Sequence, residues 1–384
     1  MFSVVIYTVT ALLLFVLAIN VSNRDKVLYA SSGRHLTMGS WEIVTSFVIF
    51  CFIAGARYKV GVDHLSYLAE YQNYVRFGSG IRDTMEPGFV FITKFFSGLG
   101  LHFFFYFAFW AFLQIFFVYK SCEDEKYLLP YIALCIMLGP YFLSWMNGIR
   151  QCVVACFFVY SVRFIDRKQL LPFVLGILLA STIHRSALML LPFFLLAYRP
   201  VALKNRAFDY GLLVACVLLG ASPSWLGLTG QAADVLEMLG YDEYADRYDD
   251  MVEMEFTRIA WGPSRISIFL TDVLIILFYP KMREYYEPSR KLDILFFLFF
   301  FGVCLYNLFA NTSHIFLRPI EYFTLFRLPL TAYTLFYLKK AHKTKIFIAM
   351  CLLLFTYIYF IVYKSTFGQN TALQTNLYKF FFMQ

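Results

Sequence analysis

The sequence predicts an all-α polytopic integral membrane protein. We expect about twelve transmembrane helices, with interfacial or re-entrant helices on the periplasmic side. Hydrophobic residues make up 60% of the 384 residues, and charged residues only 15%. Soluble domains carry about 25% charged residues, so too few are present here for a water-exposed surface. Long apolar runs recur along the whole chain, which is typical of helices that cross a bilayer. A cytosolic enzyme, a nucleic-acid-binding protein and a disordered chain are therefore excluded.

Each apolar run predicts one span, and the spans together form a single transmembrane domain over residues 1–384. Several runs are shorter than the roughly 20 residues that a perpendicular helix needs, which indicates tilted or paired segments. The first run lacks a basic flank and a small-residue cleavage site, so we expect it to be retained and not removed as a signal peptide. The predicted spans are 2–20, 41–56, 101–119, 128–145, 152–165, 170–183, 186–198, 207–222, 264–280, 292–310, 321–338 and 345–363.

Basic residues orient these spans. More than half of the 33 Lys and Arg lie in six short loops at alternate span ends, namely 21–40, 120–127, 163–169, 199–206, 281–291 and 339–345. Such loops are cytoplasmic by the positive-inside rule, which puts both termini and the larger loops 57–100 and 223–263 outside. This topology requires that residues 86–100 do not cross the membrane. Their short length between Pro and Gly breakers predicts an interfacial or re-entrant helix.

Five arginines lie on the outer side or within predicted spans, where a positive charge is unfavourable. One such arginine could be a snorkelling side chain or half of a structural ion pair. Five on one side favour an anion site, because a guanidinium binds phosphate through two parallel hydrogen bonds. These residues are Arg57, Arg150, Arg185, Arg318 and Arg327.

Two short polar segments contain further candidates. Asn147, Arg150 and Gln151 are spaced i, i+3, i+4, so a helix beginning there presents them on one face and adds its N-terminal preference for anions. Asn147 and Gln151 could also simply cap that helix. His184 and Arg185 interrupt two apolar runs. A buried, hydrogen-bonded histidine is the simpler interpretation, but the adjacent arginine favours an imidazole that moves a proton or donates to a phosphate oxygen.

Loop 57–100 carries aromatic and acidic residues. Asp63, Tyr67 and Tyr71 lie on one side of a predicted outer helix, where they suit a sugar ring that stacks on tyrosine and hydrogen-bonds a carboxylate. Asp63 as a helix N-cap and the tyrosines as an interfacial aromatic belt are equally good interpretations. Glu86 precedes Pro87 at a helix start, where both residues are favoured for structural reasons.

Taken in order and spacing, these motifs resemble the EpsG family, which comprises Wzy-like bacterial membrane proteins that polymerise exopolysaccharide, capsule or O-antigen. The resemblance is clearest over residues 55–195, and loop 223–263 matches nothing in it. The matching motifs are Gly61-x-Asp63-x-x-x-Tyr67-x-x-x-Tyr71, Glu86-Pro87-Gly88-Phe89, Asn147-Gly148-Ile149-Arg150-Gln151, His184-Arg185-Ser186-Ala187 and Arg318-x-x-x-Tyr322-Phe323.

The resemblance implies a glycan polymerase in the bacterial cytoplasmic (inner) membrane, with its active site facing the periplasm. Its partners are two undecaprenyl-pyrophosphate-linked glycans within the membrane lipid, and the growing chain moves from one lipid carrier onto the next repeat unit. A chain-length regulator is a candidate protein partner, and nucleic acid is not expected. The implied enzyme is a metal-independent glycosyltransferase without a cofactor.

The motifs assign roles within that reaction. His184, Arg150 and Asp63 are the candidate catalytic residues, and we prefer His184 or Asp63 over Glu86 as the proton acceptor. No metal ligands are expected. The candidate substrate-binding residues are Arg57, Tyr67, Tyr71, Glu86, Asn147, Gln151, Arg185, Arg318 and Tyr322.

Other membrane proteins share parts of this pattern. A lipid-linked oligosaccharide flippase or other transporter would have a similar cationic cavity, but its functional charges should also line the inner half of the bundle. An O-antigen ligase uses the same donor and is chemically the nearest alternative. A membrane acyltransferase would place its histidine on a path open to the cytoplasm.

Overall fold

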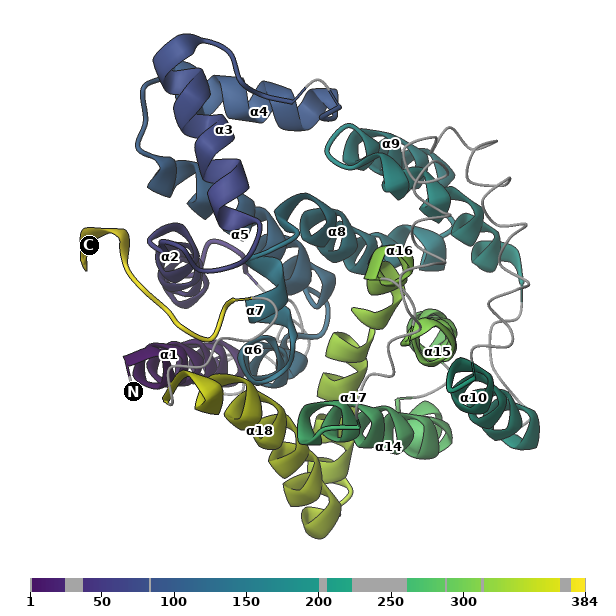
Figure 1. Cartoon of the computed structure of the whole chain (residues 1–384). Helices are drawn as coiled ribbons and strands as arrows, with labels where there is room; N and C mark the ends of the chain where they lie inside the picture. Colours follow the sequence, from purple (N-terminus) through teal and green to yellow (C-terminus); the bar gives the residue numbers. More distant parts are fainter. Residues whose placement is uncertain are drawn as a thin grey trace.

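The computed structural model is a bundle of helices (Figure 1). It describes residues 2–24, 37–82, 84–199, 206–222, 261–286, 289–311, 314–366 and 374–383. The predicted all-α class is confirmed for these residues, whose only β-type pairing is a single bridge between Arg57 and Phe380. The helices are α1 (Phe2–Arg24), α2 (Trp41–Gly55), α3 (His64–Phe77), α4 (Pro87–Gly98), α5 (Phe103–Ser121), η1 (Lys126–Leu128), α6 (Leu129–Leu138), α7 (Tyr141–Trp145), α8 (Ile149–Asp166), α9 (Leu170–Ser181), η2 (Arg185–Tyr198), α10 (Arg206–Gly220), α14 (Pro263–Tyr285), α15 (Arg290–Phe309), α16 (His314–Thr324), α17 (Arg327–Lys340), α18 (Thr344–Thr366) and η4 (Phe381–Met383).

Each predicted apolar run is largely helical, but fewer helices have the length and hydropathy of a complete span. Four described helices do: Phe2–Asn23, Phe103–Ser121, Arg290–Phe309 and Thr344–Val362. Shorter apolar helices are Trp41–Gly55, Lys126–Leu138, Leu170–Ser181 and Arg185–Tyr198. The chain is therefore consistent with a polytopic membrane protein, and the count of about twelve spans stays a prediction. Most of loop 223–263 lies outside the described residues.

Two predicted spans are interrupted. The run 128–145 is divided at Gly139–Pro140 into α6 and α7, and the run 321–338 at Leu325–Phe326 into α16 and α17. Proline has no backbone N–H to donate within a helix, but it is tolerated in the first helical turn. Pro329 lies in the first turn of α17. Hydropathy alone does not detect such breaks, because the residues on both sides remain apolar.

An aromatic cluster attaches α3 and α4 to α5. Figure 1 shows α3 and α4 together at one edge of the bundle. Phe89 of α4 stacks on Trp110 of α5 with ring centroids 5.5 Å apart, and Tyr71 of α3 stacks on Tyr106 of α5 at 4.8 Å. The Tyr71 hydroxyl donates to the Leu101 carbonyl at 2.7 Å. These contacts fix α3 and α4, which carry several candidate site residues, against the bundle.

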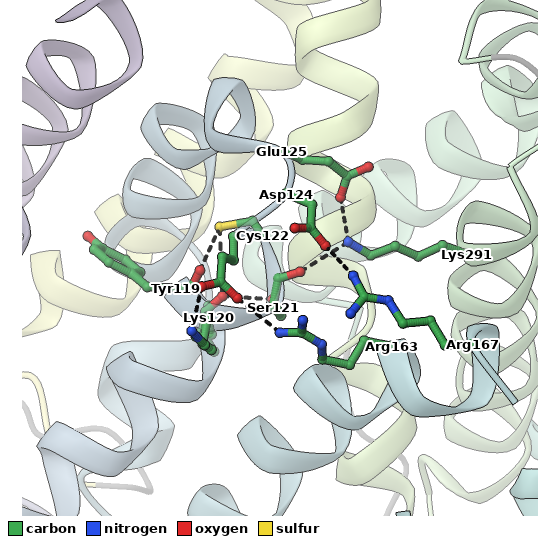
Figure 2. A network of polar contacts seen from close by, with 11 residues as sticks. Tyr119, Lys120, Ser121, Cys122, Asp124, Glu125, Arg163, Arg167 and Lys291 are labelled. Atoms are coloured by element: carbon green, nitrogen blue, oxygen red, sulfur yellow. Dashed lines mark hydrogen bonds and ion pairs between the residues drawn. The ribbon is translucent and has the colours of Figure 1, made fainter. Parts of the chain in front are cut away.

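A network of ion pairs connects the helix ends at one side of the bundle (Figure 2). Glu123 accepts from both Lys120 and Arg163, and Arg167 donates to Asp124 at 2.8 Å. Lys291 pairs with Glu125 and donates to the Ser121 carbonyl at 3.0 Å. These residues come from loops 120–127, 163–169 and 281–291, which the sequence assigns to the cytoplasmic side. We call this set of ion pairs the charged clamp.

At the opposite end of the bundle, the C-terminal segment connects the N-terminus of α1 with the residues that follow α2. Residues 374–383 run beside residues 56–61, near α2 in Figure 1. Tyr58 N donates to the Lys379 carbonyl at 2.9 Å, and Phe381 N donates to the Ala56 carbonyl at 2.9 Å. Tyr378 N donates to Ser3 Oγ at 2.8 Å. Residues 2–3, residues 374–383 and the start of loop 57–100 therefore lie at the same end, as the predicted topology requires.

Cysteine labelling tests which end faces outward. We expect a membrane-impermeant maleimide to label Ser66→Cys and Lys379→Cys in cells with a permeabilised outer membrane, and to label Gln169→Cys only after lysis. All three positions are exposed, and the basic loops keep Gln169 in the cytoplasm. The matched control is the parent chain, whose cysteines are all buried or half-buried. If Gln169→Cys alone is labelled before lysis, the protein has the opposite orientation and the prediction is wrong.

Candidate active site

The carboxylate of Glu86 connects three of the candidate site residues. Its Oε1 atom lies 3.0 Å from Nδ1 of His184 and accepts the backbone N–H of Arg185 at 3.0 Å. Its Oε2 atom forms an ion pair with Nη1 of Arg150. The side chains of Glu86, Arg150 and His184 are 13%, 17% and 20% exposed, so this Glu86 cluster is enclosed without being sealed. The three side chains are therefore each partly accessible from outside the protein.

The start of α4 places Glu86 beside His184. Glu86 is the extended N-cap residue and Pro87 occupies the first helical position. The next two amides, of Gly88 and Phe89, donate to the Thr182 carbonyl at 2.7 Å and 3.3 Å. A Cβ atom on Gly88 would lie 2.8 Å from that carbonyl oxygen, so only glycine permits this approach. The Glu-Pro-Gly sequence thus brings α4 onto the turn that precedes His184.

Arg150 is held from three directions. It lies in the first turn of α8, and its Nε donates to the hydroxyl of Tyr67 in α3 at 3.4 Å. Its guanidinium lies over the ring of Phe89 in α4, 5.1 Å from the centroid. A cation over an aromatic face is stabilised by the ring quadrupole. Together with Glu86, these contacts fix the plane of the guanidinium.

The surroundings of Glu86 keep it ionised. Burial by itself would raise the pKa of Glu86, but the hydrogen bond to His184, the charge of Arg150 and the Arg185 amide lower this pKa to about 2. Opposite charge and hydrogen bonds both favour the carboxylate form. The cluster therefore contains a permanent negative charge between a histidine and an arginine.

A second group of candidate residues meets at α16. Gln151 donates through Nε2 to the Arg318 carbonyl and, at 3.2 Å, to Glu321 Oε2. Tyr322 Oη lies 2.6 Å from Oγ of Ser186, two residues after His184. The Glu86 cluster and this group are linked along the chain, because Gln151 follows Arg150 and Ser186 follows Arg185.

Two of the predicted arginines have structural contacts instead. Arg57 is buried and donates to the carbonyls of Ala54 and Met146, the latter at 3.0 Å. Arg327 forms a buried two-hydrogen-bond pair with Asp272 of α14, with Nη2 and Oδ2 2.9 Å apart. Arg327 thus forms the structural ion pair that the sequence left open for a single arginine, whereas Arg57 is held by backbone carbonyls.

The remaining candidates lie near the cluster or support it. Asp63 is the N-cap residue of α3, but its side chain makes no capping hydrogen bond. Asn147 lies against Gly61, where a Cβ atom would be 2.7 Å from Asn147 Oδ1. Gly61 also has φ +99°, a conformation that glycine adopts without strain. Tyr71 is used in the packing of α3, as described above.

Comparison with known protein families identifies the family of this chain. Residues 41–380 match the EpsG family. The chain belongs to the EpsG family. EpsG proteins are Wzy-like polysaccharide polymerases, so the chain is a glycosyltransferase-like membrane protein of polysaccharide biosynthesis. The match extends beyond the clearest region of resemblance, residues 55–195, and includes Arg318 and Tyr322. Comparison with curated proteins and with solved structures finds no match.

The sequence does not predict the central position of Glu86 in this site of the EpsG-family protein. Its helix-start position explained it adequately, whereas the structure pairs it with residues 64 and 98 positions away. Thr182 was also missed, because it contributes a backbone carbonyl that any residue could supply. The Glu-Pro-Gly sequence was the available signal, since a glycine directly inside a helix start marks a close backbone approach.

Two glycines of α4 test the contact with Thr182. We expect Gly88→Ala to destabilise the protein by about 1–3 kcal/mol, because the new methyl group must displace the Thr182 backbone. Gly98→Ala is the matched control, since no atom lies within 4 Å of its Cβ position. Thermal unfolding in detergent would measure both. Equal unfolding temperatures for the two variants would contradict the close approach.

Proposed function

We propose that this EpsG-family protein is a Wzy-type polymerase. It joins undecaprenyl-pyrophosphate-linked repeat units into O-antigen, capsule or exopolysaccharide on the periplasmic face of the bacterial inner membrane. The observation that carries the proposal is the Glu86 cluster, which holds a histidine and an arginine together at the end of the bundle opposite the charged clamp. A proton acceptor and an anion-binding group are the two functions that this transfer needs.

The proposed step is a single glycosyl transfer. The bond between the anomeric carbon of the growing chain and its pyrophosphate oxygen breaks, and the electron pair leaves with undecaprenyl pyrophosphate. The acceptor hydroxyl oxygen of the next repeat unit bonds to that carbon, and its proton passes to His184. Preorganised guanidinium groups stabilise the charge that develops on the pyrophosphate. We assign this role to Arg150, Arg185 and Arg318, and the scheme uses no metal and no cofactor.

Arg150 can bind phosphate while its own contacts persist. Its Nη1 pairs with Glu86 and its Nε with Tyr67, so its Nη2 amino group is available for a phosphate oxygen. Tyr67 contacts Arg150, Gln151 follows Arg150 in α8, and Tyr322 contacts Ser186. We assign these three residues to binding sugar hydroxyls. We assign Arg57, Tyr71 and Asn147 to the framework of the site, and Asp63 is the second candidate for the proton acceptor.

The charged clamp favours a polymerase over a flippase. A transporter that alternates its access must open both ends of the bundle. Here Glu123, Asp124 and Glu125 join the ends of α5, α8 and α15 through ion pairs. This arrangement supports a fixed site at the opposite end. An O-antigen ligase would use the same donor, and only the acceptor would differ.

Arg150 variants test the anion-binding role. We expect Arg150→Ala to lower polymer formation by about 10²–10³-fold, the usual effect of removing one charge-stabilising donor. Arg150→Lys should restore little, because one ammonium cannot contact Tyr67, Glu86 and phosphate together. Polymer ladders from purified protein and a lipid-linked repeat unit provide the measurement. Arg167→Ala, which breaks an exposed ion pair in the charged clamp, is the control and should retain activity. An active Arg150→Ala variant would place the anion site elsewhere.

His184 variants test the proton transfer. We expect His184→Ala to lower turnover by about 10²–10⁴-fold, the usual contribution of general-base catalysis, while the lipid-linked donor still binds through the arginines. Turnover per folded molecule and donor binding are measured on the same preparation. Near-normal turnover would remove His184 from the mechanism, and Asp63→Asn would then be the variant to assay.

A further inference from the structure

The Glu86 carboxylate is not suited to be the proton acceptor itself, because both of its oxygens already have hydrogen-bond partners. Oε1 already accepts from His184 and from the Arg185 amide, and Oε2 is paired with Arg150. These contacts lower the pKa of Glu86 to about 2, so the carboxylate holds a proton poorly at neutral pH. The role of Glu86 must lie in what it does to its partners.

The hydrogen bond to His184 determines where the imidazole carries its proton. An ionised carboxylate only accepts hydrogen bonds, so Nδ1 of His184 must be the donor across the 3.0 Å contact. A neutral imidazole has one N–H, and fixing it at Nδ1 leaves the lone pair on Nε2. The backbone of His184 is fixed as well, because its amide donates to the Ala180 carbonyl and its carbonyl accepts from the Ala187 amide, both at 3.0 Å.

We infer that Glu86 is the positioning residue of the site: it holds His184 as the Nδ1–H tautomer, with Nε2 as the proton-accepting atom, and it holds Arg150 in the same contact. This inference rests on the proposed glycosyl transfer. It assigns one carboxylate to both halves of the reaction, because the base and the leaving-group stabiliser share a single anchor. Their separation is then fixed before substrate binds.

The other charged and polar groups near His184 come from neighbouring elements. Arg185 follows it in η2, Arg150 of α8 lies on the far oxygen of Glu86, and Tyr67 of α3 contacts Arg150. From α16, Tyr322 contacts Ser186, while Glu321 and the Arg318 backbone contact Gln151. Among these, Glu86 is the carboxylate in contact with the imidazole ring.

A double-mutant cycle separates positioning from general damage to the fold. Glu86→Gln keeps the size of the side chain but removes the charge and offers an amide that can select the wrong tautomer. We expect kcat to fall by about 10²–10⁴-fold, as when the orienting carboxylate of a catalytic triad becomes an amide. In the His184→Ala background, Glu86→Gln should lower kcat by a factor at least ten times smaller, because the imidazole that Glu86 positions is absent. If the fold-decreases in kcat of the two single substitutions multiply in the double variant, the inference is overturned.

The chain offers a matched control at the opposite end of α8. Glu123 also joins two cationic side chains, Lys120 and Arg163. Glu123→Gln removes an equivalent carboxylate from the charged clamp, and we expect kcat to stay within threefold of the wild type. A loss as large as that of Glu86→Gln would mean that breaking any such pair is damaging, and the inference would fail.

The tautomer is measured without any substrate. Spectra of the full-length protein labelled with ¹⁵N-histidine contain six histidines, and the signal of His184 is the one lost in His184→Gln. We expect wild-type His184 to be protonated at Nδ1, and Glu86→Leu to move the proton towards Nε2. Protonation at Nε2 in the wild type would overturn the inference whether or not the protein polymerises glycans. If the wild type makes no polymer while the tautomer is as expected, the proposed function fails and the positioning contact stands.

Discussion

The N-terminus of α4 rests on the carbonyl of Thr182, and the geometry of the site depends on this contact. The first amides of a helix have no partner within the helix, so a buried helix start needs an external acceptor. Here a backbone carbonyl supplies it, at 2.7 Å from the Gly88 amide. The same contact brings the Glu86 carboxylate to His184 and Arg185, two and three residues after Thr182. One backbone interaction thereby joins an outer helix to the catalytic candidates.

Arg57 and Arg327 are more deeply buried than Arg150, and their partners differ in kind. Arg327 is buried and pairs with the buried Asp272 through two hydrogen bonds. Arg57 donates through Nη1 and Nη2 to two backbone carbonyls. Arg150 differs, because its carboxylate partner is shared with His184 and its side chain remains 17% exposed. A shared anchor and partial exposure are features that a structural ion pair does not need.

The sequence predicts the helical membrane class, the family and most residues of the Glu86 cluster, because composition and short motifs carry that information locally. It does not predict which residues pair, since His184 and Arg150 lie 98 and 64 positions from Glu86. A carboxylate before Pro87 has the same appearance in sequence whether it caps a helix or binds a histidine. Hydropathy likewise misses the break at Gly139–Pro140, because apolar residues lie on both sides of it.

Helix α8 relates the two ends of the bundle. At one end Arg163 pairs with Glu123, and at the other Arg150 pairs with Glu86. The helix between them has 18 residues, or about 27 Å at 1.5 Å per residue. The two pairs have different surroundings, because Glu123 also binds Lys120, whereas Arg150 is also held by the Tyr67 hydroxyl and the Phe89 ring. Electrostatic stabilisation of a leaving group requires charges that do not reorganise during the reaction. The contacts of Arg150 with Glu86, Tyr67 and Phe89 meet this requirement at its own end of α8, so the position of its guanidinium does not depend on the charged clamp.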